Sequence, residues 1–390
     1  MESRRGSKRY VALAALAIGL FRAPVAASET LPVDQVRVGM TGYGLTVVRG
    51  YGIERFDVEV IGVLRNAAVG RSVILVSLSG LDLAETGVVA GMSGSPVYLE
   101  GRLAGAVASG WGFSKKAVAG VTPIESMESI VPERPGVAGP GRAAGPPIAD
   151  RAAFFACLAA VSEEARLEEL RRAMLESLPA AHAFPAGDST LLSFQGAGIP
   201  ASTLAAFREP LSRLGVNEGN HGLLGASPAV ATGGTASASP STLAPGAAVT
   251  AYLVRGDLQL GATGTVTEVY PDRRFVAFGH PFLGAGELEL PVATAEVVTI
   301  VSSLYQSFKI ANGGEPRYRL TNDRDTGVGG RTDRTASTIP VTVLVEGEGR
   351  PTREFRFEAA SHPKLLPLLA GLVADASMTA ADPTPRDRLL

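Results

Sequence analysis

The sequence has little of several features that would point to particular classes of protein. A single cysteine, Cys157, occurs among 390 residues, so no disulfide can form within the chain. Lysine and arginine (36) nearly balance aspartate and glutamate (38), and no basic cluster beyond the first nine residues indicates a nucleic-acid partner. Beyond the N-terminus, no apolar run reaches the roughly 18 residues of a membrane span. Metal-ligand spacings, a phosphate loop and a dinucleotide fingerprint are also lacking, so we expect no metal and no cofactor.

The N-terminus has the pattern of an export signal. An apolar run over residues 11–21 is preceded by the basic residues Arg4, Arg5, Lys8 and Arg9. Small residues follow at positions 25–28, and cleavage is expected after Ala27 or Ser28. The sequence therefore predicts a signal peptide over residues 1–28. The mature chain is expected in the periplasm, the cell envelope or outside the cell, without spanning a membrane.

The remainder divides into two strand-rich blocks. Glycine (46) and proline (26) make up about 18 % of the chain, against a usual ~12 %, which favours short strands and turns. In the first block, residues 29–131, apolar and polar residues alternate with the period of a half-buried strand over residues 44–49, 55–64 and 72–78. A second such block covers residues 247–350. The pattern predicts a mainly β fold.

The segments outside the two blocks differ in composition. Residues 132–246 are predicted to form an insert, in which a Pro/Gly-rich linker is followed by a helical pattern at 150–178 and a low-complexity connector at 226–246. Residues 351–390 are predicted to contain one more strand, a short apolar helix near 363–373 and a tail. The expected architecture is two β blocks joined by a partly helical insert.

The segment Gly91-Met92-Ser93-Gly94-Ser95-Pro96 is the most informative motif. Glycines on both sides of a serine allow a tight turn that aims backbone N–H groups at one point, where the oxyanion of a tetrahedral intermediate forms. The segment resembles the nucleophile loop of chymotrypsin-like serine proteases. That resemblance implies Ser93 as nucleophile, with Ser95 as the alternative, and an oxyanion hole formed by the N–H groups of Gly91 and Ser93. It also implies that Ser109, Gly110 and Trp111 pair with the substrate backbone as an added strand. The structural interpretation is a glycine-rich turn whose serines bond to the backbone.

A nucleophilic serine needs a base, and the chain has four histidines. His182 and His221 lie in loops and His362 at a helix start, where each is most simply a surface residue. His280 ends a strand in the phrase Phe-Gly-His-Pro-Phe, a position from which barrel folds present functional groups. On spacing alone, a structural histidine is the favoured interpretation.

A second resemblance changes this weighting. The chain is similar to the SpoIVB family of serine peptidases over roughly residues 31–130 and 247–335. The matched segments are the serine loop, Leu45-Thr46-Val47, Phe56-Asp57-Val58-Glu59, Gly264-Thr265-Val266-Thr267, Gly279-His280 and the Asp-Arg…Gly stretch at 323–330. The resemblance implies two chymotrypsin-like β-barrel halves with His280 as general base. Asp57, in a matched strand, is interpreted as structural, and Asp323 and Asp325 as turn-forming residues.

The chain departs from the family in two ways. The histidine half follows the serine half here, although a catalytic triad depends on geometry and not on chain order. Alignment on Thr86-Gly87 places Ser79 where the family has its acid, so Asp82, three residues on, is the candidate acid. The alternative is a dyad in which a backbone carbonyl or another carboxylate orients His280. No counterpart of the family's PDZ domain is evident.

The sequence thus predicts an exported serine endopeptidase that acts on protein or peptide substrates through Ser93, His280 and Asp82. The competing hypothesis, from another class, is an exported binding or scaffold module that retains the peptidase fold without activity.

Overall fold

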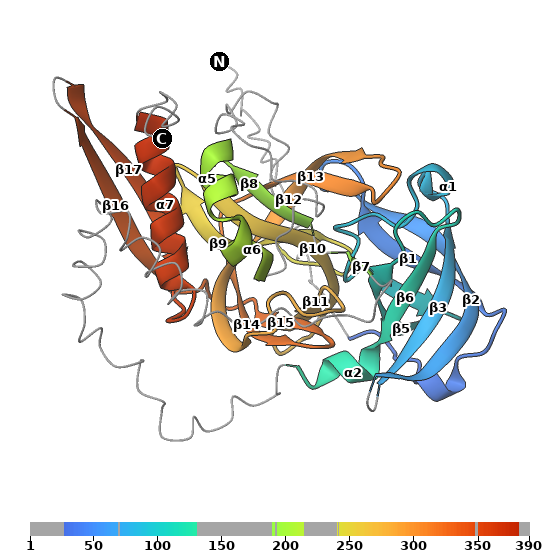
Figure 1. The fold of residues 1–390 in the computed structure, drawn as a ribbon. Helices are drawn as coiled ribbons and strands as arrows, with labels where there is room; N and C mark the ends of the chain where they lie inside the picture. Colours follow the sequence, from blue (N-terminus) through green and yellow to red (C-terminus); the bar gives the residue numbers. More distant parts are fainter. Residues whose placement is uncertain are drawn as a thin grey trace, which may run out of the picture.

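Two closed β-barrels lie next to one another (Figure 1). The computed structural model describes residues 27–68, 71–130, 189–191, 193–213, 240, 242–347 and 350–381. The predicted signal peptide and the predicted helical pattern at 150–178 lie outside these residues, except for Ala27 and Ser28. The mainly β fold class with two chymotrypsin-like halves is confirmed.

The first barrel is a ring of antiparallel strands that closes because β4 pairs with both β1 and β5. In ring order its strands are β4 (Pro96–Leu99), β1 (Thr41–Val47), β2 (Ile53–Ala68), β3 (Arg71–Ser79), β6 (Val118–Pro123) and β5 (Arg102–Gly110). The predicted alternation is observed in β3, where every second side chain from Ile74 to Leu78 is buried. These side chains form the barrel core with Phe56 and Val121 of other strands and with Met92 of the loop before β4.

The second barrel closes through pairing of β12 with β9. In ring order its strands are β12 (Gly286–Val301), β14 (Tyr318–Arg324), β15 (Gly327–Arg331), β11 (Arg274–Ala277), β10 (Gln259–Val269) and β9 (Ala248–Gly256). The hairpin of β16 (Thr338–Gly347) and β17 (Arg350–Ala360) extends from β9, and the helix α7 (Leu366–Ala381) packs beside it (Figure 1). Helix α7 is longer than the sequence predicted. Its leucines, which all lie at or before Leu372, join the second core, and Ala376 and Ser377 are buried as well, so packing continues past residue 373.

The insert does more than connect the barrels. Its described part contains β7 (Ser189–Thr190), β8 (Ser193–Ala197), α5 (Ala201–Ala206) and α6 (Arg208–Arg213). Strand β7 pairs with β5 of the first barrel, whereas β8 pairs with β10 of the second. The insert therefore adds a strand to each barrel, which the residue pattern did not predict.

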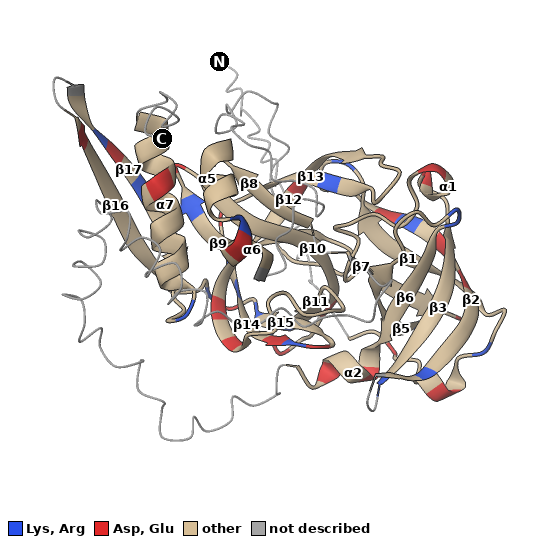
Figure 2. Ribbon diagram, viewed as in Figure 1, with Lys and Arg blue, Asp and Glu red and all other residues tan. Residues whose placement is uncertain are grey.

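Three smaller elements flank the barrels: the 3-10 helix η1 (Val33–Gln35) and the helices α1 (Leu83–Thr86) and α2 (Ile124–Glu128). Strand β13 (Phe308–Gly313) pairs with the far end of β12. Charged residues of both signs are interspersed along the strands in Figure 2, in keeping with a nearly neutral chain. The described residues contain no helix long and apolar enough to cross a membrane.

Candidate active site

The serine loop, residues 91–96, lies between α1 and β4 and turns sharply twice. Gly91 and Gly94 have φ values of +96° and +91°, in the left-handed region that favours glycine. The N–H of Ser95 donates to the carbonyl of Met92 at 2.9 Å, which closes the turn around Ser93. The N–H of Gly94 donates to the carbonyl of Val107 in β5 at 2.7 Å, so the loop is fastened to its own barrel.

Strand β10 of the second barrel binds the same loop. The N–H of Thr265 donates to the carbonyl of Ser93 at 2.7 Å, and its hydroxyl donates to the carbonyl of Gly91 at 2.9 Å. The hydroxyl of Thr267 donates to the carbonyl of Gly94 at 2.8 Å. Both threonines belong to the matched segment at 264–267. Their role is to hold the serine loop at the junction of the barrels.

His280 reaches that junction from β11. The backbone turns at Phe278 and Gly279, which have φ values of +68° and +70°. The hydroxyl of Thr122 donates to the carbonyl of Gly279 at 2.6 Å, and a Cβ added to Gly279 would lie 3.0 Å from the Val107 carbonyl. Because Val107 also binds the N–H of Gly94, the segments that carry Ser93 and His280 pack on the same strand. The fold brings these distant parts of the sequence together.

The two predicted catalytic side chains are both buried. Ser93 is 0 % exposed and His280 2 % exposed, and neither Ser93 Oγ nor His280 Nε2 makes a hydrogen bond. A Ser93–His280 hydrogen bond is therefore not formed in this conformation. Such bonds often tighten only when substrate is bound. The alternative nucleophile Ser95 is equally buried, and its Oγ also lacks a partner.

A backbone carbonyl orients the His280 ring. Nδ1 lies 2.7 Å from the carbonyl oxygen of Pro281, so it carries the proton and donates it, and Nε2 is left as the acceptor. Burial lowers the pKa of His280 to about 4, although the Pro281 hydrogen bond opposes this shift. A neutral ring with a free Nε2 is the form that a general base requires.

This buried neutral ring predicts a pH dependence of stability. In the unfolded chain, His280 takes up a proton as the pH falls below its ordinary pKa of 6.5. In the folded chain, its pKa is about 4, so it takes up the proton only near pH 4. We therefore expect the free energy of unfolding to fall by up to about 3 kcal/mol as the pH decreases from 6.5 to 4. Urea denaturation of the wild type and of His280→Gln measures this, because the variant lacks the contribution. Parallel curves for the two proteins between pH 4 and 6.5 would contradict the prediction.

Asp323 in β14 shapes the loop that follows His280. Its carboxylate accepts the N–H groups of Phe282 and Leu283, both at 2.7 Å, and of Ala285 at 3.1 Å. Burial raises the pKa of Asp323, while these backbone donors act in the opposite direction. The interpretation of Asp323 as a turn-forming residue was therefore wrong. It is a strand residue that holds the segment whose carbonyl orients His280.

Replacing Asp323 by asparagine is expected to lower the free energy of unfolding by about 2–4 kcal/mol, because a single amide oxygen cannot satisfy three backbone donors, two of them buried. Urea denaturation provides the measurement. Asp325→Asn is the matched control, since Asp325 is 48 % exposed and pairs only with Arg71 among the described residues. An exposed pair contributes about 1 kcal/mol at most. Equal losses in the two variants would contradict a structural role for Asp323.

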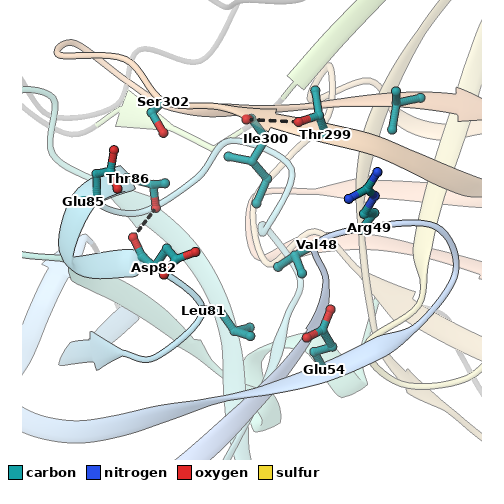
Figure 3. A pocket seen from close by; sticks show the side chains of 11 residues that line it. Val48, Arg49, Glu54, Leu81, Asp82, Glu85, Thr86, Thr299, Ile300 and Ser302 are labelled. Carbon is teal, nitrogen blue, oxygen red and sulfur yellow. Dashed lines mark hydrogen bonds between the residues drawn. The ribbon is translucent and has the colours of Figure 1, made fainter.

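The candidate acid, Asp82, lies away from the histidine. It is exposed, precedes α1 with a φ of +58°, and lines a surface pocket of about 530 Å³ with Arg49, Glu85 and Thr299 (Figure 3). Neither ring nitrogen of His280 contacts it, because Nδ1 binds Pro281 and Nε2 has no partner. Asp82 therefore does not orient the ring in this structure. The observed backbone carbonyl matches the dyad alternative.

The predicted substrate edge is already paired. Ser109 and Gly110, at the end of β5, pair with Thr190 and Ser189 of β7, and Trp111 follows as a 36 % exposed side chain. The N–H of Gly91, a predicted oxyanion donor, donates to the carbonyl of Leu191 at 2.7 Å. The sequence analysis predicted that Gly91 and Ser109 bind the substrate. No pattern in the sequence predicted that residues of the insert contact Gly91 and Ser109 instead.

A buried lysine also adjoins the serine loop. Lys309 in β13 is 0 % exposed, and its Nζ donates to Thr46 Oγ1 at 2.8 Å. Its aliphatic stem packs against Gly91, where an added Cβ would lie 3.1 Å from Lys309 Cδ. Burial lowers the pKa of Lys309 to about 7. Lysines are rarely fully buried, but nothing in the residue pattern near 309 marked this one.

Two closed barrels with a glycine-flanked serine loop held between them define a chymotrypsin-like fold. Residues 25–123 match the model of the family described as SpoIVB peptidase S55. The resemblance to this serine peptidase family is thereby confirmed over the first barrel, which contains Ser93. His280 and the rest of the second barrel lie outside the matched segment. No curated protein and no solved structure matches the chain.

Proposed function

We propose that the chain is an exported serine endopeptidase with Ser93 as nucleophile and His280 as general base. The observation that carries this proposal is that Ser93 and His280, from different barrels, are held at one junction while their Oγ and Nε2 atoms lack partners. Buried polar atoms without hydrogen bonds are costly, and they are common where chemistry needs free groups. The family match supports a peptide substrate.

The chemistry follows from the geometry. Ser93 Oγ attacks the carbonyl carbon of a peptide bond and passes its proton to His280 Nε2, while the Pro281 carbonyl holds Nδ1–H. The N–H groups of Gly91 and Ser93 receive the oxyanion. Collapse of the tetrahedral intermediate gives an acyl-Ser93 ester, and His280 returns the proton to the departing amine. Water, activated by His280, then hydrolyses the ester.

The competing function is a binding module that retains the fold. It is favoured by the position of Asp82, which leaves His280 without a carboxylate on Nδ1. A fluorophosphonate probe, which reacts covalently with an activated serine, separates the two. Labelling of the full chain that is lost in Ser93→Ala supports the peptidase, whereas a folded chain that never reacts supports the binding module.

The export proposal rests on the basic and apolar pattern of residues 1–28. N-terminal sequencing of the chain recovered from the cell envelope or the medium tests it. A mature N-terminus just after residue 27 or 28 is the expected result. Recovery of the whole chain inside the cell, with Met1 retained, would refute it.

A further inference from the structure

A segment of this chain lies where a peptide substrate would bind. We propose that residues 189–191, here called the strap, occupy the acyl-side subsites of the Ser93 site in cis. The site then takes extended peptides with leucine at the residue whose carbonyl faces Gly91. This inference rests on the proposed peptidase function. It names the substrate class of that site and the contact that restrains it.

The backbone of the strap makes two contacts that the mechanism reserves for a substrate. Ser189 and Thr190 pair antiparallel with Gly110 and Ser109, as a peptide does when it adds a strand to a sheet edge. The next carbonyl, that of Leu191, accepts the N–H of Gly91 at 2.7 Å. A substrate whose carbonyl is to be attacked by Ser93 requires this donor. The strap therefore follows the path of a substrate up to the residue that would be acylated.

The side chain of Leu191 indicates which residue the site accepts. Leu191 is 0 % exposed and belongs to the apolar core of the first barrel, together with Val89 and Met92. A Cβ on Gly110 would lie 3.3 Å from Leu191 Cδ2 and 3.1 Å from Val88 Cβ, so glycine leaves the room that leucine fills. A charged residue at this point would be buried in apolar surroundings, at a large cost. The subsite is apolar and of leucine size.

With the strap in place, an external peptide has no access to the nucleophile. Ser93 and His280 are buried, and neither lines the cavity of about 530 Å³ beside Asp82 or the cavity of about 580 Å³ beside Tyr43. Beyond Leu191 the chain passes into β8, which is paired with β10, so the strap is tethered to the second barrel. A tethered segment acts at an effective concentration of roughly millimolar. Free peptides at micromolar concentration therefore compete poorly.

Peptide binding provides the decisive test, because it needs no catalysis. The full chain carrying Ser93→Ala is titrated with fluorescein-labelled Gly-Asp-Ser-Thr-Leu, the sequence of residues 187–191, and binding is followed by anisotropy. Adding Leu191→Ala weakens the strap, so we expect at least about tenfold tighter binding of the peptide. Ile199→Ala is the matched control, because Ile199 is also a fully buried aliphatic residue of the insert but packs in the second core. It should leave binding unchanged.

A peptide that ends in aspartate should bind the strap variant at least about tenfold more weakly than the leucine peptide. If Leu191→Ala does not fold, Leu191→Val removes one methylene and permits the same comparison. The proposal is overturned if the strap variant binds the peptide no better than its parent, or if it binds leucine and aspartate peptides alike. If the strap only holds the two barrels together, Leu191→Ala would lower the free energy of unfolding without changing the affinity for the peptide.

Covalent labelling separates failure of this inference from failure of the proposed function. In the chain that retains Ser93, Leu191→Ala should react with the fluorophosphonate at least about tenfold faster than wild type, because the strap occupies the Ser93 site in a smaller fraction of the molecules. If Ser93 is labelled but the strap variant does not bind the peptide more tightly, the strap inference is wrong and the proposed peptidase function is retained. Tighter, leucine-selective binding without labelling in any variant overturns the peptidase and leaves the strap as the occupant of a peptide-binding cleft.

Discussion

Ser93→Ala is expected to abolish fluorophosphonate labelling and to lower peptide hydrolysis by roughly 10³-fold or more. The hydroxyl supplies the bond-forming atom of the proposed reaction, and the glycine-flanked turn aims no other oxygen in the same way. The variant should fold normally, because Ser93 Oγ makes no hydrogen bond in the structure and its loss leaves no partner unsatisfied. Labelling followed by mass spectrometry, and hydrolysis of a leucine-containing peptide, provide the two measurements. Both measurements should give a larger difference when the Ser93→Ala comparison is made in the Leu191→Ala variant, in which the strap is weakened.

Ser95→Ala is the matched control for this experiment. Ser95 lies in the same loop, is also 0 % exposed, and its Oγ also lacks a hydrogen bond. Its removal should leave labelling intact. Retention of labelling in Ser93→Ala together with its loss in Ser95→Ala would transfer the nucleophile to Ser95. A folded wild-type chain and strap variant that never react would instead favour the binding module.

Gly94→Ala is expected to lower the free energy of unfolding by at least about 3 kcal/mol. A Cβ on Gly94 would lie 1.9 Å from the carbonyl oxygen of Thr265 and 2.4 Å from the nitrogen of Phe278. Both neighbours are backbone atoms of the second barrel, so neither is able to move aside as a flexible side chain would. Residue 94 also has a φ of +91°, which alanine adopts reluctantly. Urea or thermal denaturation measures the loss.

Gly101→Ala separates the two causes. Gly101 has a similar φ of +79°, but a Cβ there would meet nothing within 4 Å. Its replacement should cost only about 1–2 kcal/mol, the penalty of the left-handed backbone alone. The difference between the variants therefore reports the docking of the serine loop on the second barrel. Similar losses at both positions would show that the barrels are not held together through this loop.

The local patterns in the sequence predicted much of the framework. Alternation over residues 72–78 predicted β3, because a barrel strand buries every second side chain. The glycines around Ser93 predicted a sharply turned loop, because a positive φ is a local property that glycine alone adopts freely. The same patterns did not predict β13 and β14. Their pairing with β12 depends on residues brought close by the fold.

The candidate site was predicted in part. His280 was placed at a strand end, and the family resemblance associated it with Ser93. The structure packs both segments against the Val107 carbonyl. The role of Asp82 stays a prediction that this structure does not support, since its side chain lies on a surface pocket. No local pattern distinguishes an aspartate that orients a ring from an aspartate that begins a short helix.

The sequence by itself determined the strand-rich blocks, the serine loop and the resemblance of the first block to the SpoIVB peptidases, because each depends on residues that are neighbours along the chain. Only the tertiary structure decided how His280 is oriented, why Asp323 is buried, where Lys309 lies and what covers Gly91. Each of these depends on contacts between segments far apart in the sequence, and one backbone hydrogen bond, from Gly91 to Leu191, is the clearest example. Such contacts form only when the two barrels and the insert assemble, and no local periodicity encodes them.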